Sequence, residues 1–283
     1  MQQRILGRTD LRVSAVGFGG SRLGSLVLSQ GLRKTDALLH EALDLGITLF
    51  DTADIYGGGL SERALGRAFQ KRRDSVVILT KAGYIPPSRR ALRRMAGPLA
   101  AFANPSKPGP SSKTQDFSSD YLVRALESSL RRLNMDYVDI FLLHSLPIDD
   151  FGLPDSLDAV ERMRAAGKCR AYGFSLAAPP ARWPDLSKTG ARVVGIPVHP
   201  PGSSLEITMG QLLEHGMGAL AYRPFGTGAV FSGGPSRALP GQEEGTPAHI
   251  ALRYALDLPA VASVVIGTSD SRHLAENVQT IGD

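Results

Sequence analysis

Short runs of apolar and β-branched residues alternate along the chain with longer amphipathic stretches. Strand-like runs are expected at 14–18, 48–51, 76–80, 138–143, 170–174, 192–197, 217–222 and 262–266. Helix-like stretches follow them at 35–45, 61–70, 119–132, 155–167, 180–187, 205–215, 247–257 and 271–280. This alternation indicates βαβ units and a parallel sheet. Eight such pairs are what a (β/α)8 TIM barrel of the α/β class requires.

Other segments complete the predicted architecture. A β-hairpin is expected before the first barrel strand, within 4–14, with Gly7 and Asp10 at its turn. Segments 83–117 and 226–246 interrupt the repeat and are rich in Gly, Pro and Ser. Each follows a barrel strand, so we expect long loops at the mouth, the first of which covers the substrate. No other break appears, and 1–283 is expected to form a single domain.

Helix ends also have recognisable residues. Ser61 and Ser119 stand where N-caps are expected, and Pro247 fits the first turn of its helix. Gly46 and Gly167 follow helical stretches, as C-terminal capping glycines do.

Composition limits the class of protein. Hydrophobic residues make up 42% of 283 positions, which is enough for a full core. The single cysteine, Cys169, excludes an internal disulfide and suits a reducing compartment. The polar start MQQRILGRTD has no apolar signal region, and no apolar run is long enough to cross a bilayer. We expect a soluble, cytoplasmic protein.

The formal charge of +5 is concentrated in short basic runs at 71–73, 89–94 and 131–132. Such runs are usually solvated faces, and no nucleic-acid-binding motif accompanies them. The six histidines are scattered, without metal-ligand spacing. We therefore expect no nucleic-acid partner, no membrane partner and no metal.

Four polar residues gather at the ends of predicted buried strands. Asp51 closes ITLFD, Tyr56 follows in TADIYGGG, Lys81 closes VVILTK and His144 closes VDIFLLH. The carboxyl ends of barrel strands all meet at one mouth, where active sites lie. A carboxylate, a phenol, an amine and an imidazole at that place form a proton-transfer set.

With these residues in place, the chain resembles the aldo-keto reductase family over nearly its whole length. ITLFDTADIYGGGLSERALGRAF is similar to the first signature of the family, with Thr48 where Asn is more usual. SSLRRLNMDYVDIFLLHSLP, AYRPFGTGAVF and VVIGTSDSRHLAENV are similar to three further motifs, in the family's order. Four motifs in this order make the resemblance specific.

The resemblance implies a role for each member of the polar set. Tyr56 would be the general acid or base, exchanging a proton with the substrate oxygen. Lys81 would lie beside it and favour the phenolate, and Asp51 would hold Lys81 as an ion pair. His144 would orient the carbonyl oxygen.

The resemblance also implies a dinucleotide site for NADP or NAD, with NADP the usual family cofactor. Tyr222 would stack on the nicotinamide. The full set of implied cofactor-binding residues is Gly19, Gly20, Ser175, Tyr222, Arg223, Phe225, Gly226, Gly228, Gly267, Thr268, His273, Glu276 and Asn277.

Some positions depart from the family pattern. Leu176 and Gly195 stand where Asn and Gln usually read the nicotinamide amide, and neither side chain makes hydrogen bonds. Gly267 and Ser269 fill positions where basic residues usually grip a 2′-phosphate, although Arg272 is nearby. The residues therefore leave the choice between NADP and NAD open.

The main hypothesis is a nicotinamide-dependent oxidoreductase that reduces an aldehyde or ketone, or oxidises the alcohol. Its partner would be a small carbonyl or alcohol, and the protein a monomer or small homo-oligomer. One alternative is a non-redox acid–base enzyme, a lyase, isomerase or cyclase, that uses the same four residues. Another is a regulatory subunit resembling potassium-channel β subunits. The sequence does not identify the substrate.

Overall fold

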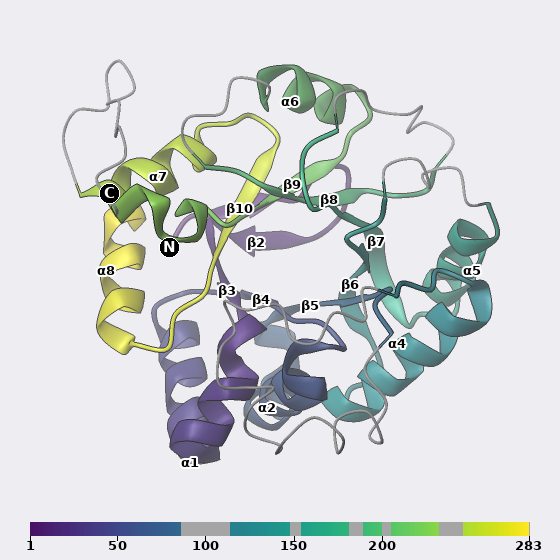
Figure 1. Cartoon of the computed structure of the whole chain (residues 1–283), viewed down its shortest axis with the longest axis horizontal. Helices are drawn as coiled ribbons and strands as arrows, with labels where there is room; N and C mark the ends of the chain where they lie inside the picture. The colour runs from purple at the N-terminus through teal and green to yellow at the C-terminus, as the bar shows by residue number, and fades with distance from the viewer. Residues whose placement is uncertain (86–113, 148–153, 181–188, 200–204, 232–245, 283) are drawn as a thin grey trace.

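Eight parallel strands close into a barrel in the computed structural model, which describes residues 1–85, 114–147, 154–180, 189–199, 205–231 and 246–282 (Figure 1). Around the barrel the strands are β3 (Val16–Gly19), β4 (Leu49–Asp51), β5 (Val77–Ala82), β6 (Val138–His144), β7 (Cys169–Ser175), β8 (Val193–Pro197), β9 (Gly218–Tyr222) and β10 (Val261–Ile266). Strand β10 pairs with β3 and closes the ring. Each strand lies where the hydrophobic pattern predicted it, so the predicted TIM barrel is confirmed.

Helices surround the barrel (Figure 1). They are α1 (Leu23–Asp44), α2 (Leu60–Phe69), α4 (Ser119–Leu133), α5 (Pro154–Ala165), α6 (Leu205–Glu214), α7 (Pro247–Leu256) and α8 (Ser271–Gly282). Short 3-10 helices are η1 (Gly20–Arg22), η2 (Tyr56–Gly59), η3 (Arg73–Ser75) and η6 (Gly226–Phe231). The helix predicted at 180–187 lies almost wholly outside the described residues.

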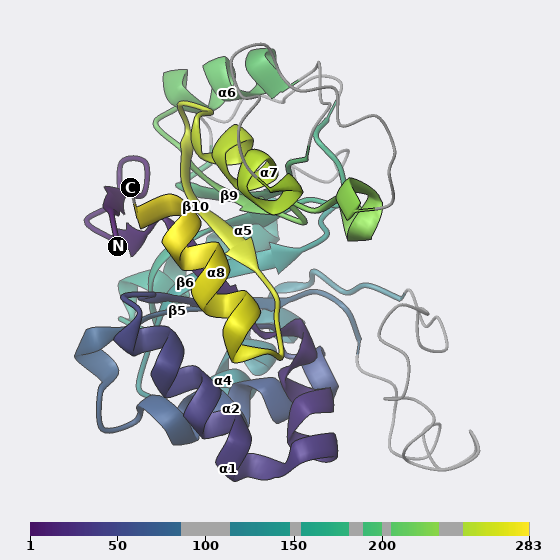
Figure 2. The same ribbon diagram turned by 90° about the vertical axis from the view of Figure 1, so that its left-hand side faces the viewer.

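The predicted hairpin is present as β1 (Gln3–Ile5) paired antiparallel with β2 (Arg12–Ser14). It lies at one end of the barrel (Figure 2). Its apolar residues Leu6, Leu11 and Val13 are buried against the side chains that fill the barrel interior. The hairpin therefore closes the amino-terminal end of the barrel and leaves the carboxyl ends of the strands for a site.

Side chains from the strands form two hydrophobic layers. One fills the barrel, with Leu49, Leu79 and Leu142 among its members. The other lies between strands and helices and includes Phe50 and Phe141. Because neighbouring residues of one strand enter different layers, both faces are buried, and the strands appear in the sequence as continuous apolar runs.

The predicted N-caps were wrong by one or two residues. Helix α2 begins after Gly59, and the Ser61 hydroxyl instead donates to the carbonyl of Gly20 at 2.9 Å. The N-cap of α4 is Ser118, one residue before Ser119. Pro247 lies in the first turn of α7 as expected.

Helix α1 is longer than the predicted 35–45, because it starts at Leu23. The extra length is interrupted at Gly31, whose φ of 81° is not helical. Gly31 and its exposed polar neighbours lack a periodic apolar pattern, so no sequence signal marked this first part of the helix.

Candidate active site

The four polar residues predicted from the sequence lie together at the barrel mouth. Asp51 ends β4, Lys81 is the second-last residue of β5, and His144 ends β6. Tyr56 is the first residue of η2, the turn that follows β4. Neighbouring strands thus deliver a carboxylate, an amine and an imidazole to one place, and the turn adds the phenol.

Lys81 is the centre of this group. Its Nζ donates to Oδ1 of Asp51 and, at 3.0 Å, to the carbonyl of Thr52. The same Nζ lies 5.0 Å from the ring centroid of Tyr56. Lys81 is 1% exposed, so its charge is compensated by Asp51 and by neighbouring dipoles rather than by solvent.

Burial and pairing act in opposite directions on this ion pair. Burial raises the pKa of Asp51 against the attraction of Lys81. Burial also lowers the pKa of Lys81, but Asp51 and Tyr56 together raise it above its usual value. We therefore describe Lys81 as an ammonium at neutral pH.

Tyr56 keeps its proton at neutral pH. Burial raises its pKa above 10.0, while the nearby charge of Lys81 opposes that rise. The attraction of Lys81 favours the phenolate, but burial outweighs it. A protonated phenol beside a cation is a proton donor held ready for a developing oxyanion.

The ring of His144 packs against the ring of Tyr56. The two rings are 5.7 Å apart and nearly perpendicular, and Tyr84 packs edge-on against His144 from a centroid distance of 5.0 Å. Burial, and then the charge of Lys81, hold the pKa of His144 well below 6.5. Its buried Nδ1 contacts no hydrogen-bonding partner among the described residues. The imidazole is therefore neutral and retains hydrogen-bonding capacity.

The predicted mouth loop 83–117 leaves and returns beside this group. Only its ends are described, and 86–113 lies outside the described residues. Ile85 donates to the carbonyl of Thr114 at 3.0 Å, so the two ends pair with each other. The side-chain amide of Gln115 donates to the carbonyl of His144 at 2.9 Å. The ends of the segment are thus fastened to the mouth.

The turn after β9, which was predicted to contact the dinucleotide, contains several residues with left-handed backbone conformation. Arg223, Gly226 and Gly228 all have positive φ, and the turn continues as η6. The amides of Gly226 and Gly228 already donate to the carbonyls of Arg223 and Phe225. These two amides are therefore already used within the turn. The continuation of the predicted loop 226–246 beyond Phe231 lies largely outside the described residues.

The ends of β3 and β10 are lined by glycine. Gly267 lies next to the carbonyl of Gly19, and a Cβ on Gly267 would meet nothing closer than 3.5 Å. Gly20 has a packing reason of its own, since a Cβ there would lie 2.8 Å from the carbonyl of Asp51. Thr268 follows Gly267 and is half-buried.

Helix α8 supplies the predicted adenosine-end residues His273, Glu276 and Asn277. His273 and Glu276 are exposed, and Asn277 is half-buried. Nearby, Arg272 donates to Asp270 at 3.1 Å, so its charge is already paired. Binding of a dinucleotide along the glycine-lined strand ends stays a prediction.

The departures at strands β7 and β8 have structural counterparts. Ser175 is buried at the end of β7. Leu176 packs in the layer between barrel and helices. The ring of Tyr222 lies directly against Gly195. Stacking of Tyr222 on nicotinamide remains a prediction.

Sequence reasoning missed Asp54, two residues before Tyr56. Asp54 is 6% exposed, and one of its carboxylate oxygens has no partner among the described residues. Burial, and then repulsion from Glu62, raise its pKa to about 7. Its position in the TADIY motif, two residues before Tyr56, could have marked Asp54 as a candidate site residue.

Glu62 connects the elements that pack next to the site. It is fully buried, accepts from the Thr80 hydroxyl at 2.7 Å and pairs with Arg132 at 2.5 Å. Helices α2 and α4 and strand β5 are thereby connected directly behind Lys81.

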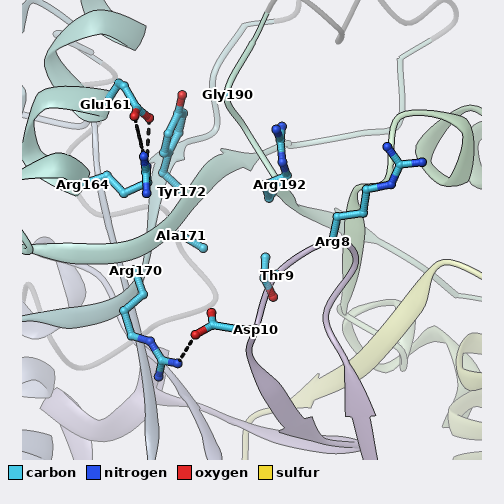
Figure 3. Close-up of a pocket in the computed structure, with 10 residues that line it drawn as sticks. All are labelled: Arg8, Thr9, Asp10, Glu161, Arg164, Arg170, Ala171, Tyr172, Gly190 and Arg192. Carbon is cyan, nitrogen blue, oxygen red and sulfur yellow. Dashed lines mark hydrogen bonds and ion pairs between the residues drawn. The ribbon is translucent and has the colours of Figure 1, made fainter.

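A cavity of about 440 Å³ lies at the opposite, amino-terminal end of the barrel (Figure 3). It is lined by the hairpin turn and the starts of β7 and β8. Two of its arginines are paired, Arg170 with Asp10 and Arg164 with Glu161 (Figure 3). Polar residues at this end of a TIM barrel usually support stability. The cavity does not include the four polar residues of the mouth.

No group of three or more His, Cys, Asp and Glu among the described residues could hold a metal ion. No described helix is both long enough and apolar enough to cross a bilayer.

Residues 15–281 match the sequence model of the Aldo/keto reductase family. The chain belongs to this family. The resemblance seen in four motifs is thereby confirmed, and it covers nearly the whole barrel. Aldo/keto reductases are oxidoreductases that use nicotinamide cofactors.

Relatives of this aldo/keto reductase agree with that class. The uncharacterized oxidoreductase YqkF of Bacillus subtilis (strain 168) is 30% identical over 99% of this chain and 90% of its own length. L-galactose dehydrogenase of Arabidopsis thaliana is 27% identical over 99% of this chain and 88% of its own. The holo form of aldo-keto reductase AKR11C1 from Bacillus halodurans is 28% identical, with a TM-score of 0.81 over 100% of this chain and 91% of that one.

Proposed function

We propose that this chain reduces an aldehyde or ketone to an alcohol, or catalyses the reverse oxidation, with Tyr56 as the general acid or base. The observation that carries the proposal is the position of Lys81. Its ammonium is hydrogen-bonded to Asp51 and lies 5.0 Å from the Tyr56 ring, and His144 packs edge-on against the same ring. A bound NADH or NADPH would supply the hydride.

The residues divide the remaining work. Tyr56 gives its phenolic proton to the substrate oxygen as negative charge develops there. The ammonium of Lys81 stabilises the phenolate that remains, and Asp51 keeps that ammonium in place. His144, neutral because it is buried, donates one N–H to the same substrate oxygen and orients it.

We propose that the dinucleotide lies along the glycine-lined ends of β3, β9 and β10. The dinucleotide could approach the protein backbone closely at four glycines that lack side chains, Gly19, Gly226, Gly228 and Gly267. Tyr222 would lie at its nicotinamide end and α8 at its adenosine end. Leu176 and Gly195 offer no amide contact. We therefore expect micromolar or weaker affinity, with little preference between NADPH and NADH.

Two measurements on the intact protein test this proposal. Fluorescence titration with NADH and NADPH should show saturable binding of both. Turnover should then appear with generic aldehydes or with small sugars, the class to which the substrate of the Arabidopsis relative belongs. Failure of both dinucleotides to bind at millimolar concentration would contradict the oxidoreductase proposal.

A second candidate is an acid–base reaction without hydride transfer. The packing of Leu176 in the core and the contact of Tyr222 with Gly195 favour it, because both reduce the contacts available to nicotinamide. The same titration separates the two candidates, since the non-redox reaction needs no dinucleotide.

A further inference from the structure

Gly195 on β8 and Tyr222 on β9 are in direct contact inside the barrel. A Cβ built on Gly195 would lie 2.1 Å from Cε2 and 2.8 Å from Cζ of Tyr222. Real Cβ atoms do not approach so closely, so any side chain at 195 would displace the phenol. Tyr222 packs with the apolar residues of the barrel interior. The Tyr222 ring can therefore take this position only because residue 195 has no side chain.

Because Gly195 leaves room for the ring, the Tyr222 hydroxyl contacts the Asp51–Lys81 ion pair. It donates to Oδ1 of Asp51 at 3.3 Å, and the same oxygen accepts from Lys81. The Lys81 ammonium lies 5.2 Å from the Tyr222 ring and 5.0 Å from the Tyr56 ring. Two phenols therefore flank the ammonium, and one of them also contacts its counter-ion.

We infer that Tyr222 is a positioning residue for the Asp51–Lys81 pair, and that Gly195 is the residue that admits it. This inference rests on the proposed function, because it concerns how readily Tyr56 releases its proton. Tyr222 stabilises the ionised carboxylate and takes up part of its charge. Without that hydrogen bond, the Asp51 charge would act more fully on Lys81 and Tyr56, and Tyr56 would hold its proton more tightly.

The expected effect is moderate, because 3.3 Å is long for a hydrogen bond between oxygens. Loss of the hydroxyl should move the ionisation of Tyr56 upward by about 0.5–1 pH unit. In the oxidation direction the phenolate is the base, so below its pKa the rate rises with pH. At a fixed pH in that range, kcat/KM for the alcohol should fall about 3–10-fold.

Three variants separate the hydrogen bond from the ring. Tyr222→Phe removes the hydroxyl and keeps the ring. Gly195→Ala keeps the hydroxyl and displaces the ring from Asp51. The double variant combines both changes. Tyr172→Phe is the matched control, because it removes a phenolic hydroxyl at the base of the barrel, where Tyr172 lines the cavity.

One readout follows the pH profile of kcat/KM, and the other needs no activity. Protein labelled with 3-fluorotyrosine is titrated by fluorine NMR, and the Tyr56 signal is identified by its loss in Tyr56→Phe. We expect Tyr222→Phe and Gly195→Ala to raise the Tyr56 titration to a similar extent. The double variant should match either single one, because both remove the same bond. Tyr172→Phe should leave the titration unchanged.

An unchanged Tyr56 titration in folded Tyr222→Phe would overturn the inference, as would full additivity in the double variant. If Gly195→Ala fails to fold, Tyr222→Phe alone decides. If the titration shifts as expected but the wild-type protein oxidises and reduces nothing, the proposed function fails and the positioning role stands.

Discussion

Lys81 and Asp51 form an ion pair whose side chains are only 1% and 6% exposed. The pair joins β5 to β4. Lys81 also donates to the carbonyl of Thr52, in the turn that follows β4. Charges so deeply buried are tolerated when each compensates the other. The pair is therefore both part of the proposed proton-transfer group and a structural connection within the barrel.

Removing one partner should destabilise the fold strongly. We expect Asp51→Asn and Lys81→Met each to lower the free energy of unfolding by about 3–5 kcal/mol, because each leaves a buried charge without its partner. The double variant should lose clearly less than the sum. Urea denaturation measures this, and disruption of the exposed Arg124–Asp120 pair by Asp120→Asn should change stability by about 0.5 kcal/mol or less. Additive losses would mean that the two charges do not compensate each other.

Tyr56→Phe tests the proposed general acid. It removes one hydroxyl, so folding and dinucleotide affinity should persist. Carbonyl reduction should fall by about 10²–10⁴-fold, the usual effect of losing a general acid. Steady-state kinetics at neutral pH measures the loss, and Tyr137→Phe, whose ring packs under Arg73, serves as the control. Near-full activity in Tyr56→Phe would show that the proton comes from another group.

The barrel was predictable because its signal is local and repeated. The strands are mostly buried apolar runs, and the polar residues at or near the ends of β4, β5 and β6 stand out against those runs. Their convergence follows from the barrel alone, since parallel strands present their carboxyl ends at one mouth. The strand pattern was therefore enough to group Asp51, Lys81 and His144.

The contact between Gly195 and Tyr222 could not be predicted in the same way. The two residues are on different strands, and their relation depends on which way one ring turns. From sequence alone, Gly195 was a lost amide contact, whereas in the structure it is space filled by a phenol. The N-cap predicted at Ser61 failed for a related reason, because the Ser61 hydroxyl donates to the carbonyl of Gly20, a partner distant in sequence.

Asp54 should make stability pH-dependent. Its pKa is raised to about 7 in the fold, from 3.8, so the folded state holds a proton that the unfolded state releases. The stability from this group is complete below about pH 4 and is lost as pH rises through about 7. Between pH 5 and 8, the wild type should therefore lose roughly 2 kcal/mol more than Asp54→Asn.

Chemical denaturation at several pH values measures that difference. The contrast between the two proteins removes the contributions of all other titrating groups. Parallel stability curves for the wild type and Asp54→Asn would show that Asp54 is ionised in the folded protein at neutral pH.

Cofactor preference should depend on Asp270. Its carboxylate accepts from the backbone N–H of Arg272 at 2.8 Å and from the guanidinium at 3.1 Å, at the start of α8. A helix N-terminus with a nearby arginine is suited to a phosphate, but here a carboxylate already occupies it. Asp270→Asn keeps a capping oxygen and removes the charge. We expect NADPH affinity to rise about 3–10-fold and NADH affinity to stay unchanged, because only NADPH carries the 2′-phosphate.

Titration of both dinucleotides at two salt concentrations measures this change. The gain for NADPH should shrink at high salt, since the charges involved are exposed. Asp155→Asn, an exposed acid in the first turn of α5, should alter neither affinity and so controls for net charge. Equal gains for NADH and NADPH in Asp270→Asn would show that the carboxylate acts on another part of the dinucleotide, and Arg272 would then have no part in the choice between cofactors.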